Sequence, residues 1–277
     1  MLIPPMTMKA YQSLLIAAAL PFLWSCSGDD DAASPKAEEQ QTATGTSTFT
    51  ATTEQPSWAV DWSGNAAAPS WQNPAGNIYD CRMNLFLTLD REMAAYSSDD
   101  DLMSVFMKGT CRAVSERNVI EDDGSVVFLP SILGTSEETG EDITLNYYCA
   151  RLRRIFTIDH LPIFEPNEGF EDEYNIVLDF VNANSKYPSV TFVDVFLPDN
   201  PPYAQIKDDA VYFFIDGECR GVCPAYERGE GFKGVVYSYR DGEQAEVRYY
   251  SASKQGFYTL KQPVTLNNTS QVIYFEY

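Results

Sequence analysis

Acidic side chains are the most abundant groups on this chain that could do chemistry. They gather in clusters over residues 99–101, 121–123, 171–173 and 208–209. Clustered carboxylates can bind calcium, and two carboxylates at a suitable separation can hydrolyse a glycosidic bond. However, the sequence has no Asp-x-Asp-x-Asp-Gly loop, and among 40 acidic residues some pair always lies close together. We therefore interpret the clusters as solvated turns, and we predict no metal, no cofactor and no catalytic residue.

Nucleophilic catalysis would need a base beside a serine or a cysteine, and the chain has a single histidine, His160. Apart from Cys26, the chain has an odd number of cysteines, so at least one of them has no partner within the chain: Cys81, Cys111, Cys149, Cys219 and Cys223. We expect these side chains to be buried as packing residues. The alternatives are disulfides of Cys111 with Cys149 or Cys81, and of Cys219 with Cys223.

Aromatic residues are the other candidates for ligand binding. Trp58, Trp62 and Trp71 lie in a stretch rich in Pro, Ser, Gly and Ala, where their indole rings could stack on sugars or on a protein partner. The alternative is that these rings plug the ends of a folded module, which we favour more for Trp71 than for the other two. Tyr148 and Tyr250 each follow a tyrosine that an alternating pattern turns inward, so we expect both on an outer face.

The charge of the chain excludes one class of partner. It carries 19 Lys and Arg against 40 Asp and Glu, a formal net charge of −21. Such a surface repels phosphate backbones at long range, so we predict no nucleic-acid binding.

The amino-terminal residues predict export and lipidation. An apolar run over residues 14–24 is too short to span a membrane and ends at Ser25-Cys26, as in a lipoprotein signal peptide over residues 1–25. Cys26 would then be acylated and would hold the protein on a lipid bilayer. Residues 26–56 are acidic at first and then rich in Ser and Thr, with few large apolar residues, so we expect a flexible tether.

An internal repeat organises the remainder. Residues 100–114 match residues 208–222 without a gap, as Asp-Asp, an apolar strand and Gly-x-Cys-Arg-x-Val. A second block at 140–157 matches 242–259. Because the repeated blocks alternate apolar and polar residues between turn signals, we predict an all-β fold of two tandem Ig-like β-sandwich modules, over residues 57–181 and 187–277.

Charged and sulfur-bearing residues recur at equivalent positions of the two copies, and we expect them to maintain the fold. Within each module we expect the arginine to pair with the aspartates upstream, because a guanidinium binds a carboxylate with two hydrogen bonds. The alternative is an arginine that grips an anionic ligand. The repeated residues are Asp100, Asp101, Cys111 and Arg112, and then Asp208, Asp209, Cys219 and Arg220.

Two of these motifs resemble surface lipoproteins of Bacteroidetes bacteria. Residues 27–31, Ser-Gly-Asp-Asp-Asp, resemble the acidic signal that exports such lipoproteins to the outer face of the outer membrane. Residues 216–222 are similar to the Gly-Asp-Glu-Cys-Arg-Gly-Val core of a module in these lipoproteins whose function is unassigned. The first copy departs from that core at Lys108, Thr110 and Ala113. The resemblance covers the chain from about Ser57, implies a fold and a place at the cell surface, and supplies no catalytic residues.

These observations favour a lipid-anchored, surface-exposed protein that binds or adheres without catalysis. The expected ligand is a glycan or another host-surface polymer, because aromatic residues are abundant and a duplicated module can strengthen weak binding. The alternatives are a structural subunit of a larger cell-surface assembly and a carboxylate-dependent hydrolase.

Overall fold

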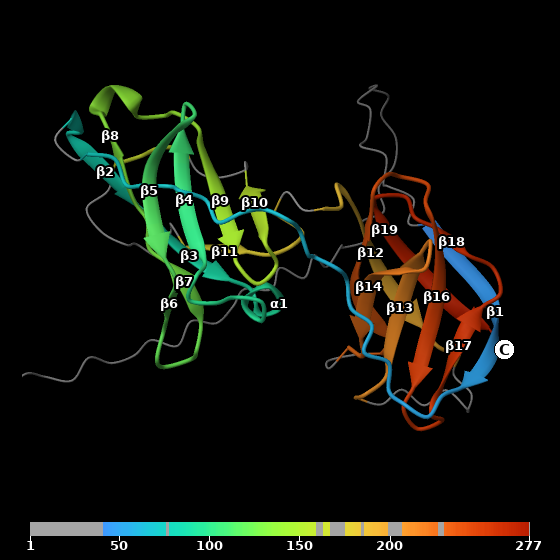
Figure 1. Ribbon diagram of the computed structural model, residues 1–277. Coiled ribbons are helices and arrows are strands. Elements are labelled where there is room, and N and C mark those ends of the chain that lie inside the picture. The colour runs from blue at the N-terminus through green and yellow to red at the C-terminus, as the bar shows by residue number, and fades with distance from the viewer. Residues whose placement is uncertain are drawn as a thin grey trace, which may run out of the picture. The chain divides into compact units, whose positions relative to one another are not determined.

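The computed structural model describes residues 41–75, 78–158, 163–166, 175–183, 186–198, 207–226 and 230–276. This part of the chain is almost entirely β-structure, which confirms the predicted all-β fold. Residues 40–277 form one compact unit. Its strands fall into two groups, which we call the first module (strands β2 to β11) and the second module (β1 and β12 to β19) (Figure 1).

The first module consists of two four-stranded sheets and a two-stranded sheet around one core. One four-stranded sheet has the order β10 (Arg154–Ile158), β9 (Ile143–Cys149), β4 (Leu102–Met107) and β5 (Thr110–Glu116). The other has the order β11 (Asn175–Leu178), β3 (Phe86–Leu89), β7 (Val126–Phe128) and β6 (Asn118–Val119). The small sheet pairs β2 (Cys81–Asn84) with β8 (Ser131–Gly134), and a short helix, α1 (Arg91–Ala94), follows β3.

The second module is a single nine-stranded sheet folded around its own core. The hydrogen-bonded path begins with β14 (Glu218–Pro224), β13 (Ala210–Ile215), β16 (Gln244–Ser251) and β17 (Gly256–Leu260). It continues through β1 (Gln41–Ala51), β19 (Ser270–Glu276), β12 (Ser189–Phe196) and β15 (Phe232–Ser238), while β18 (Val264–Thr265) pairs with β16. Inward residues of the two halves, such as Val195, Val247 and Ile273, fill the core.

The sequence repeat corresponds to a repeated arrangement of strands. The order β10-β9-β4-β5 in the first module matches β17-β16-β13-β14 in the second. Both copies shift register at the same place, between Val105 and Phe106 and between Phe213 and Phe214. Each hairpin then turns on two residues with positive φ, Lys108-Gly109 and Asp216-Gly217.

A buried aspartate fastens the sheet of each repeated block. Asp101 accepts hydrogen bonds from the hydroxyl of Tyr147 at 2.7 Å and from the backbone N–H of Ala150 at 2.8 Å. In the second module, Asp209 accepts the same two bonds from Tyr249 at 2.6 Å and from Ala252 at 2.9 Å. Each carboxylate therefore ties the start of one strand to the end of its neighbour.

The expected pairing of arginine with these aspartates is wrong. Arg112 forms a bidentate ion pair with Glu138, at 2.6 and 3.2 Å, and Arg220 pairs with Glu218 at 3.0 Å. The reason is the register. Asp101 precedes the end of β4 at which Leu102 pairs with Glu116, whereas Arg112 lies at the opposite, hairpin end of β5. At roughly 3.3 Å per residue, the guanidinium is too far away to reach the carboxylate.

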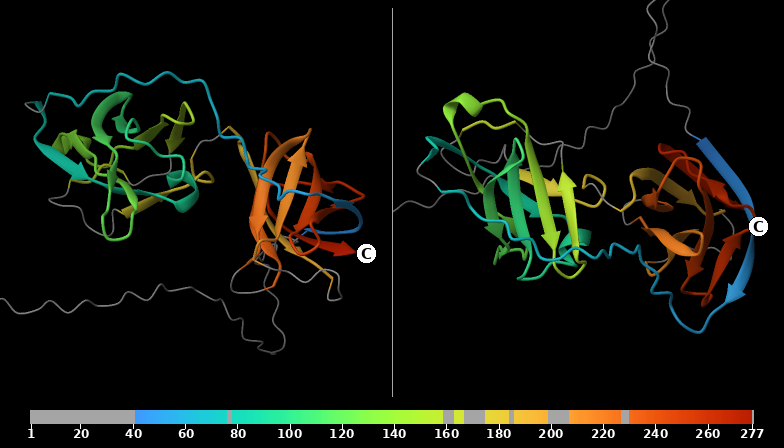
Figure 2. Two further views of the ribbon diagram at one scale, coloured as in Figure 1. Left: turned by 60° about the horizontal axis from the view of Figure 1, so that its bottom comes forward. Right: turned by 45° about the horizontal axis from the view of Figure 1, so that its top comes forward.

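The expectation of a flexible tether is wrong for residues 41–51, which form the strand β1. Residues 41–46 of β1 pair in parallel with β19, and residues 47–51 pair antiparallel with β17 (Figure 2). The sequence hides this strand because its inner face carries small residues, Ala43, Gly45 and Ser47, while threonine occupies every second position from Thr42 to Thr50. Alternating β-branched residues favour a strand even without large apolar partners. Of the expected tether, residues 26–40 lie outside the described residues.

We predict that β1 stabilises the second module alone. A chain that lacks residues 1–51 exposes the edges of β17 and β19, whose backbone groups then lose their partners. Amide hydrogen exchange should be at least about tenfold faster in β17 and β19 and unchanged in β4 and β9. A chain that lacks only residues 1–40 is the matched control. Equal protection of β17 and β19 in the two chains would contradict the prediction.

Candidate functional site

The predicted aromatic residues do not form one exposed surface. Trp62 has only 1% of its surface exposed, stacks on Phe180 with ring centroids 4.1 Å apart, and meets the ring of Tyr237 edge-on at 4.6 Å. Tyr148 and Tyr250 are also buried. Trp62, Tyr148 and Tyr250 therefore present no exposed ring to a ligand, contrary to their candidate role as ligand-binding residues. Trp62 instead takes the plugging role that we had favoured for Trp71.

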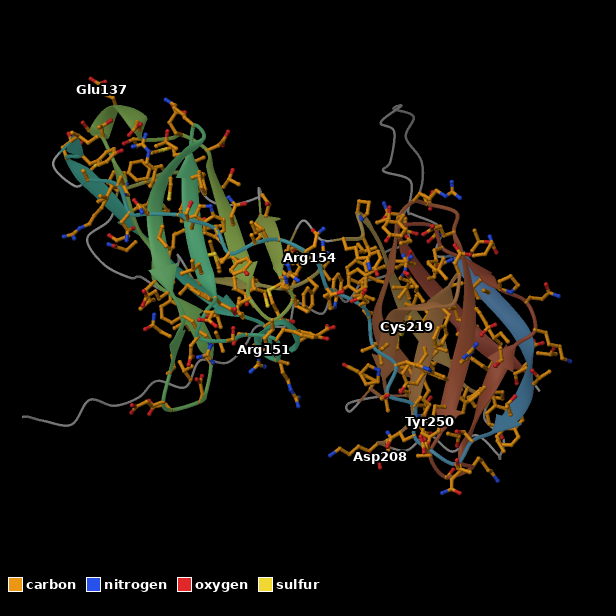
Figure 3. All side chains as sticks on the ribbon, viewed as in Figure 1. Glu137, Arg151, Arg154, Asp208, Cys219 and Tyr250 are labelled. Atoms are coloured by element: carbon orange, nitrogen blue, oxygen red, sulfur yellow. The ribbon has the colours of Figure 1, made fainter. Side chains whose placement is uncertain are left out.

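Trp58 and Trp71 are half-buried on outer faces of their sheets. Trp58 lies edge-on to Tyr212 and Phe214 at 5.1 and 4.9 Å, and these rings cluster with Tyr250. The alternating pattern was therefore read correctly, since Tyr249 lies in the core and Tyr250 on the opposite face. Tyr250 is buried because Trp58, from the chain segment before the first module, packs against its cluster. The residue pattern within one strand cannot predict such a contact. Figure 3 labels Tyr250, Cys219 and Asp208 in the second module.

The cysteines in the described residues are free thiols, without a disulfide among them. Cys149 and Cys223 are buried, as expected for packing residues, whereas Cys81, Cys111 and Cys219 are half-buried. Cys111 and Cys219 keep equivalent environments, because each Sγ donates to the carbonyl two residues further on, at 3.5 and 3.6 Å. Burial raises the pKa of the Cys219 thiol to about 11, so this sulfur is protonated at neutral pH and is a poor nucleophile.

Two sequence candidates, Cys26 and His160, lie outside the described residues. Within the described ranges, no helix is long and apolar enough to cross a membrane. The same part of the chain holds no cluster of three or more His, Cys, Asp or Glu residues that could bind a metal ion.

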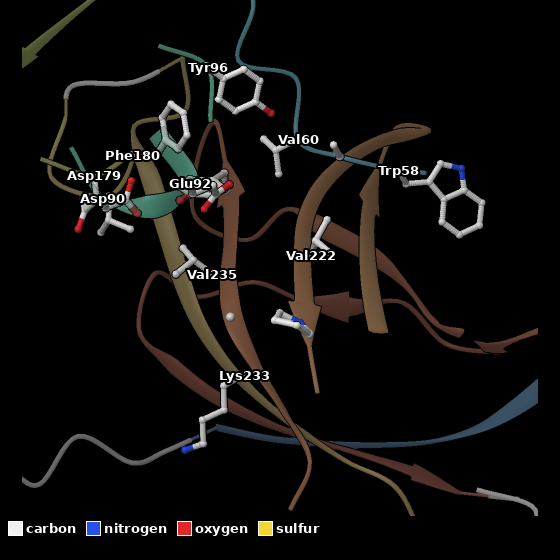
Figure 4. A pocket seen from close by; sticks show the side chains of 15 residues that line it. Trp58, Val60, Asp90, Glu92, Tyr96, Asp179, Phe180, Val222, Lys233 and Val235 are labelled. Atoms are coloured by element: carbon white, nitrogen blue, oxygen red, sulfur yellow. The ribbon is translucent and has the colours of Figure 1, made fainter. Parts of the chain in front are cut away.

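A pocket of about 570 Å³ brings together residues that are distant in the sequence (Figure 4). Three carboxylates line one side: Asp90, Glu92 and Asp179. The other walls come from the segment at 58–60, from the rings of Tyr96, Phe180 and Tyr237, and from residues 222 and 224 of β14 and 233–235 of β15. A pocket of this volume with apolar walls and a few polar groups is typical of a small-ligand site.

Local structure fixes two of the three carboxylates. Asp90 caps α1, because its Oδ1 accepts the backbone N–H of Met93 at 2.7 Å. Asp179 accepts from the backbone N–H and the side-chain amide of Asn182, at 2.6 and 3.1 Å. The backbone N–H of Asp90 donates to the carbonyl of Leu178 at 2.9 Å, which brings the two segments together. Both aspartates are therefore held rigidly in the pocket wall.

The pocket disfavours the negative charge that it carries. Burial raises the pKa of Asp90, and the nearby carboxylate of Asp179 raises it further. Glu92 keeps part of its surface exposed, yet desolvation by the pocket walls raises its pKa, and Asp90 and Asp179 add to the shift. Like charges in a partly buried site make each carboxyl harder to ionise.

A second hollow of about 310 Å³ adjoins the pocket on the outer face of β12 and β15. The two share Lys233, Gly234 and Val235 as lining residues. Phe192 lines this groove with 48% of its surface exposed. On the same face, Phe196 stacks on Tyr274 with ring centroids 5.5 Å apart, and Tyr274 is 43% exposed. Exposed aromatic rings therefore lie on this face of β12 and β19, away from the three tryptophans that the sequence analysis named as candidates.

Sequence reasoning missed both hollows, although one signal was present. Val193 and Val195 lie in the core and occupy alternate positions of β12. Because strands alternate, Phe192 and Phe196 must then face outward, and two outward phenylalanines on one strand are a signal for a binding face. The acidic pocket had no such signal, because Asp90 and Asp179 come from segments that only the fold brings together.

Comparisons with known proteins assign no family to this chain. No family model matches the sequence, and no curated protein matches it. Among solved structures, the Bacillus anthracis TIE protein matches at 11% sequence identity with a TM-score of 0.22. The match covers 71% of this chain and 34% of the other, so the chain spans about a third of that structure's length. The site is therefore interpreted from its own residues.

We predict that neutralising Glu92 stabilises the fold near neutral pH. Because the pKa of Glu92 is raised in the folded state, its ionised form opposes folding once the pH exceeds that pKa, and this penalty disappears as the pH falls below the ordinary value of 4.5. Glu92→Gln should therefore raise the free energy of unfolding, measured by urea titration, by about 0.5 kcal/mol at about pH 7 and leave it unchanged at about pH 3.5.

The matched control is Glu121→Gln, which removes an exposed carboxylate elsewhere. It should change the midpoint less than Glu92→Gln does at neutral pH. Equal effects of the two substitutions at both pH values would show that the pocket does not disfavour the ionised form of Glu92.

Proposed function

We propose that this protein is a lipid-anchored, surface-exposed binding or adhesion protein that takes a glycan as its ligand and acts without catalysis. The observation that carries the proposal is the exposed aromatic face of β12 and β19. There Phe192 lines a groove that adjoins the larger pocket, and Tyr274 stacks on Phe196 further along the same face. Flat aromatic rings bind the apolar faces of sugar rings, while carboxylates accept hydrogen bonds from sugar hydroxyls. A shallow groove beside a pocket suits one end of a polymer.

The arrangement of the carboxylates supports binding over hydrolysis. A glycosidase needs one carboxyl that donates a proton and another that attacks the sugar or activates water. Here Asp90 accepts a hydrogen bond that caps α1. Asp179 accepts hydrogen bonds from the backbone and the side chain of Asn182. These bonds to backbone N–H groups favour a structural role for both carboxylates.

The proposed location rests on the sequence. The apolar run that ends at Ser25-Cys26 supports acylation of Cys26, and the acidic residues 29–31 support export to the outer face of the outer membrane. An anchored protein that binds a surface polymer needs some distance between the membrane and its folded part. Residues 26–40 supply a polar stretch of chain ahead of β1 for this purpose.

Removal of either exposed aromatic ring should weaken glycan binding. We predict that Phe192→Ala and Tyr274→Ala each weaken binding to polysaccharides on a glycan array by at least about tenfold, because each removes an exposed ring from the aromatic face of β12 and β19. Phe49→Ala is the matched control, since Phe49 is also 48% exposed but lies on β1 and packs against Tyr258.

The same array distinguishes the alternatives. Release of reducing ends from a bound polysaccharide would favour the hydrolase. Binding to no glycan by the unmodified protein would contradict the proposal and favour a structural subunit of a larger cell-surface assembly.

Acylation can be tested separately. In a Gram-negative host fed with labelled palmitate, the full chain should incorporate the label, and Cys26→Ser should abolish its incorporation, because the thiol is the acceptor of the lipid. Cys81→Ser is the control. Undiminished labelling of Cys26→Ser would exclude Cys26 as the anchor.

A further inference from the structure

The strand β1 is held differently from the other strands of the second module. None of its residues from Thr42 to Ala51 is buried, whereas every other strand of that module buries at least one residue. Its attachment is a ladder of backbone pairs, in which residues 41–46 pair with β19 and residues 47–51 with β17. Release of β1 therefore exposes little apolar surface, and its main cost is the loss of backbone hydrogen bonds.

The place that β1 occupies is shaped for its own sequence. β1 lies between β17 and β19 in the hydrogen-bonded order of the sheet (Figure 1). The ring of Phe49 packs against Tyr258 and lies directly over Gly256, where a Cβ atom would come within 2.5 Å of the ring carbons. Only glycine at position 256 leaves room for this ring. A second copy of this chain carries a segment with the same small inward residues and the same phenylalanine.

A short segment with few contacts follows β1. Thr52 donates its backbone N–H to the carbonyl of Gln255 at 2.8 Å, and Trp58 packs edge-on against Tyr212. Between these two anchors, residues 53–57 make no hydrogen bond to either module within the described chain. We call residues 52–57 the hinge. A short hinge limits the ways in which a strand can fold back on its own module, and this favours exchange with a neighbour.

Exchange of β1 between copies conserves its contacts. A strand from a second copy makes the same backbone hydrogen bonds with β17 and β19, and it places Phe49 over the same Gly256. The two states then differ only in the hinge and in the entropy of association, so protein concentration decides between them. A short hinge holds β1 near its own module at an effective concentration on the order of 1 mM, and copies anchored on one membrane are crowded in the same way.

We propose that β1 is exchanged between two copies of the chain, so that β1 of each copy completes the second module of the other in a closed dimer. Each hinge crosses once to the other copy, and Trp58 with all later residues stays in its own copy. Both places for β1 are filled, so no strand edge is left exposed. This interaction goes beyond glycan binding and does not depend on it.

Disulfide trapping tests the exchange. Thr48 of β1 and Thr259 of β17 are register partners. One preparation of the full chain carries Thr48→Cys and another carries Thr259→Cys, each with Cys26→Ser and its own affinity tag. The two are mixed at about 1 mM, where exchange competes with folding back, and are oxidised mildly. We expect a disulfide between residue 48 of one chain and residue 259 of the other, identified by mass spectrometry of the linked peptides.

Two controls separate exchange from general unfolding. Asp194→Cys and Lys233→Cys form the matched pair, because these residues are register partners on β12 and β15 without a hinge beside them. The bond between residues 48 and 259 should be at least about tenfold more abundant between chains than the bond between residues 194 and 233. Insertion of Gly-Ser-Gly-Ser after Gln55 lengthens the hinge and should reduce the bond between residues 48 and 259 at least about threefold.

A measurement without disulfides covers the case in which the introduced thiols are placed badly. Sedimentation of the chain with Cys26→Ser at about 1 mM should show a dimer, and the lengthened hinge should shift it toward the monomer. A monomer at this concentration would overturn the proposal. Equal abundance of the two inter-chain disulfides would attribute both to unfolding and also overturn it. Linked species larger than a dimer would show that β1 passes along an open chain of copies, which overturns the closed dimer.

Discussion

The pairing of β1 with β17 and β19 constrains everything else in the molecule. Because the chain begins its described course in the second module, it must leave that module to build the first and then return. Two connections therefore join the modules, one after β1 and one after β11. Trp62 comes from the first connection and Phe180 from the second, and their rings stack at 4.1 Å. The acidic pocket lies where these two connections meet.

The same arrangement explains the contacts around Arg220. Its guanidinium lies over the rings of Tyr187 and Tyr239, 4.4 and 4.5 Å from their centroids, and Tyr187 also contacts Trp62. In the first module, Arg112 instead pairs with Glu138 and lies over Tyr79. Equivalent arginines thus meet different aromatic rings, because Tyr79, Tyr187 and Tyr239 lie outside the repeated blocks. A repeated residue keeps its place on the strand and takes its role from whatever the fold brings against it.

Much of the fold was predictable, and the reasons for the failures are physical. The repeat, the hairpins and the inward residues follow from local alternation and turn chemistry, and these are properties of neighbouring residues. β1 was missed because its inner face needs only small side chains against the core, so the usual apolar signal is absent. The burial of Trp62 was missed because its neighbours Phe180 and Tyr237 are remote in the sequence.

The position of β1 also determines how the protein would carry a mechanical load. In the proposed anchored state, a pull from the membrane reaches the folded part at the amino end of β1, where Gln41 pairs with Gln271. Tension then runs along the axis of the strand, so the hydrogen bonds to β19 and β17 share the load and must break together. The first module is attached through the far end of β1 and is shielded from that tension as long as β1 stays in place. The strand that most resembles a linker would therefore act as the clamp of the anchored molecule.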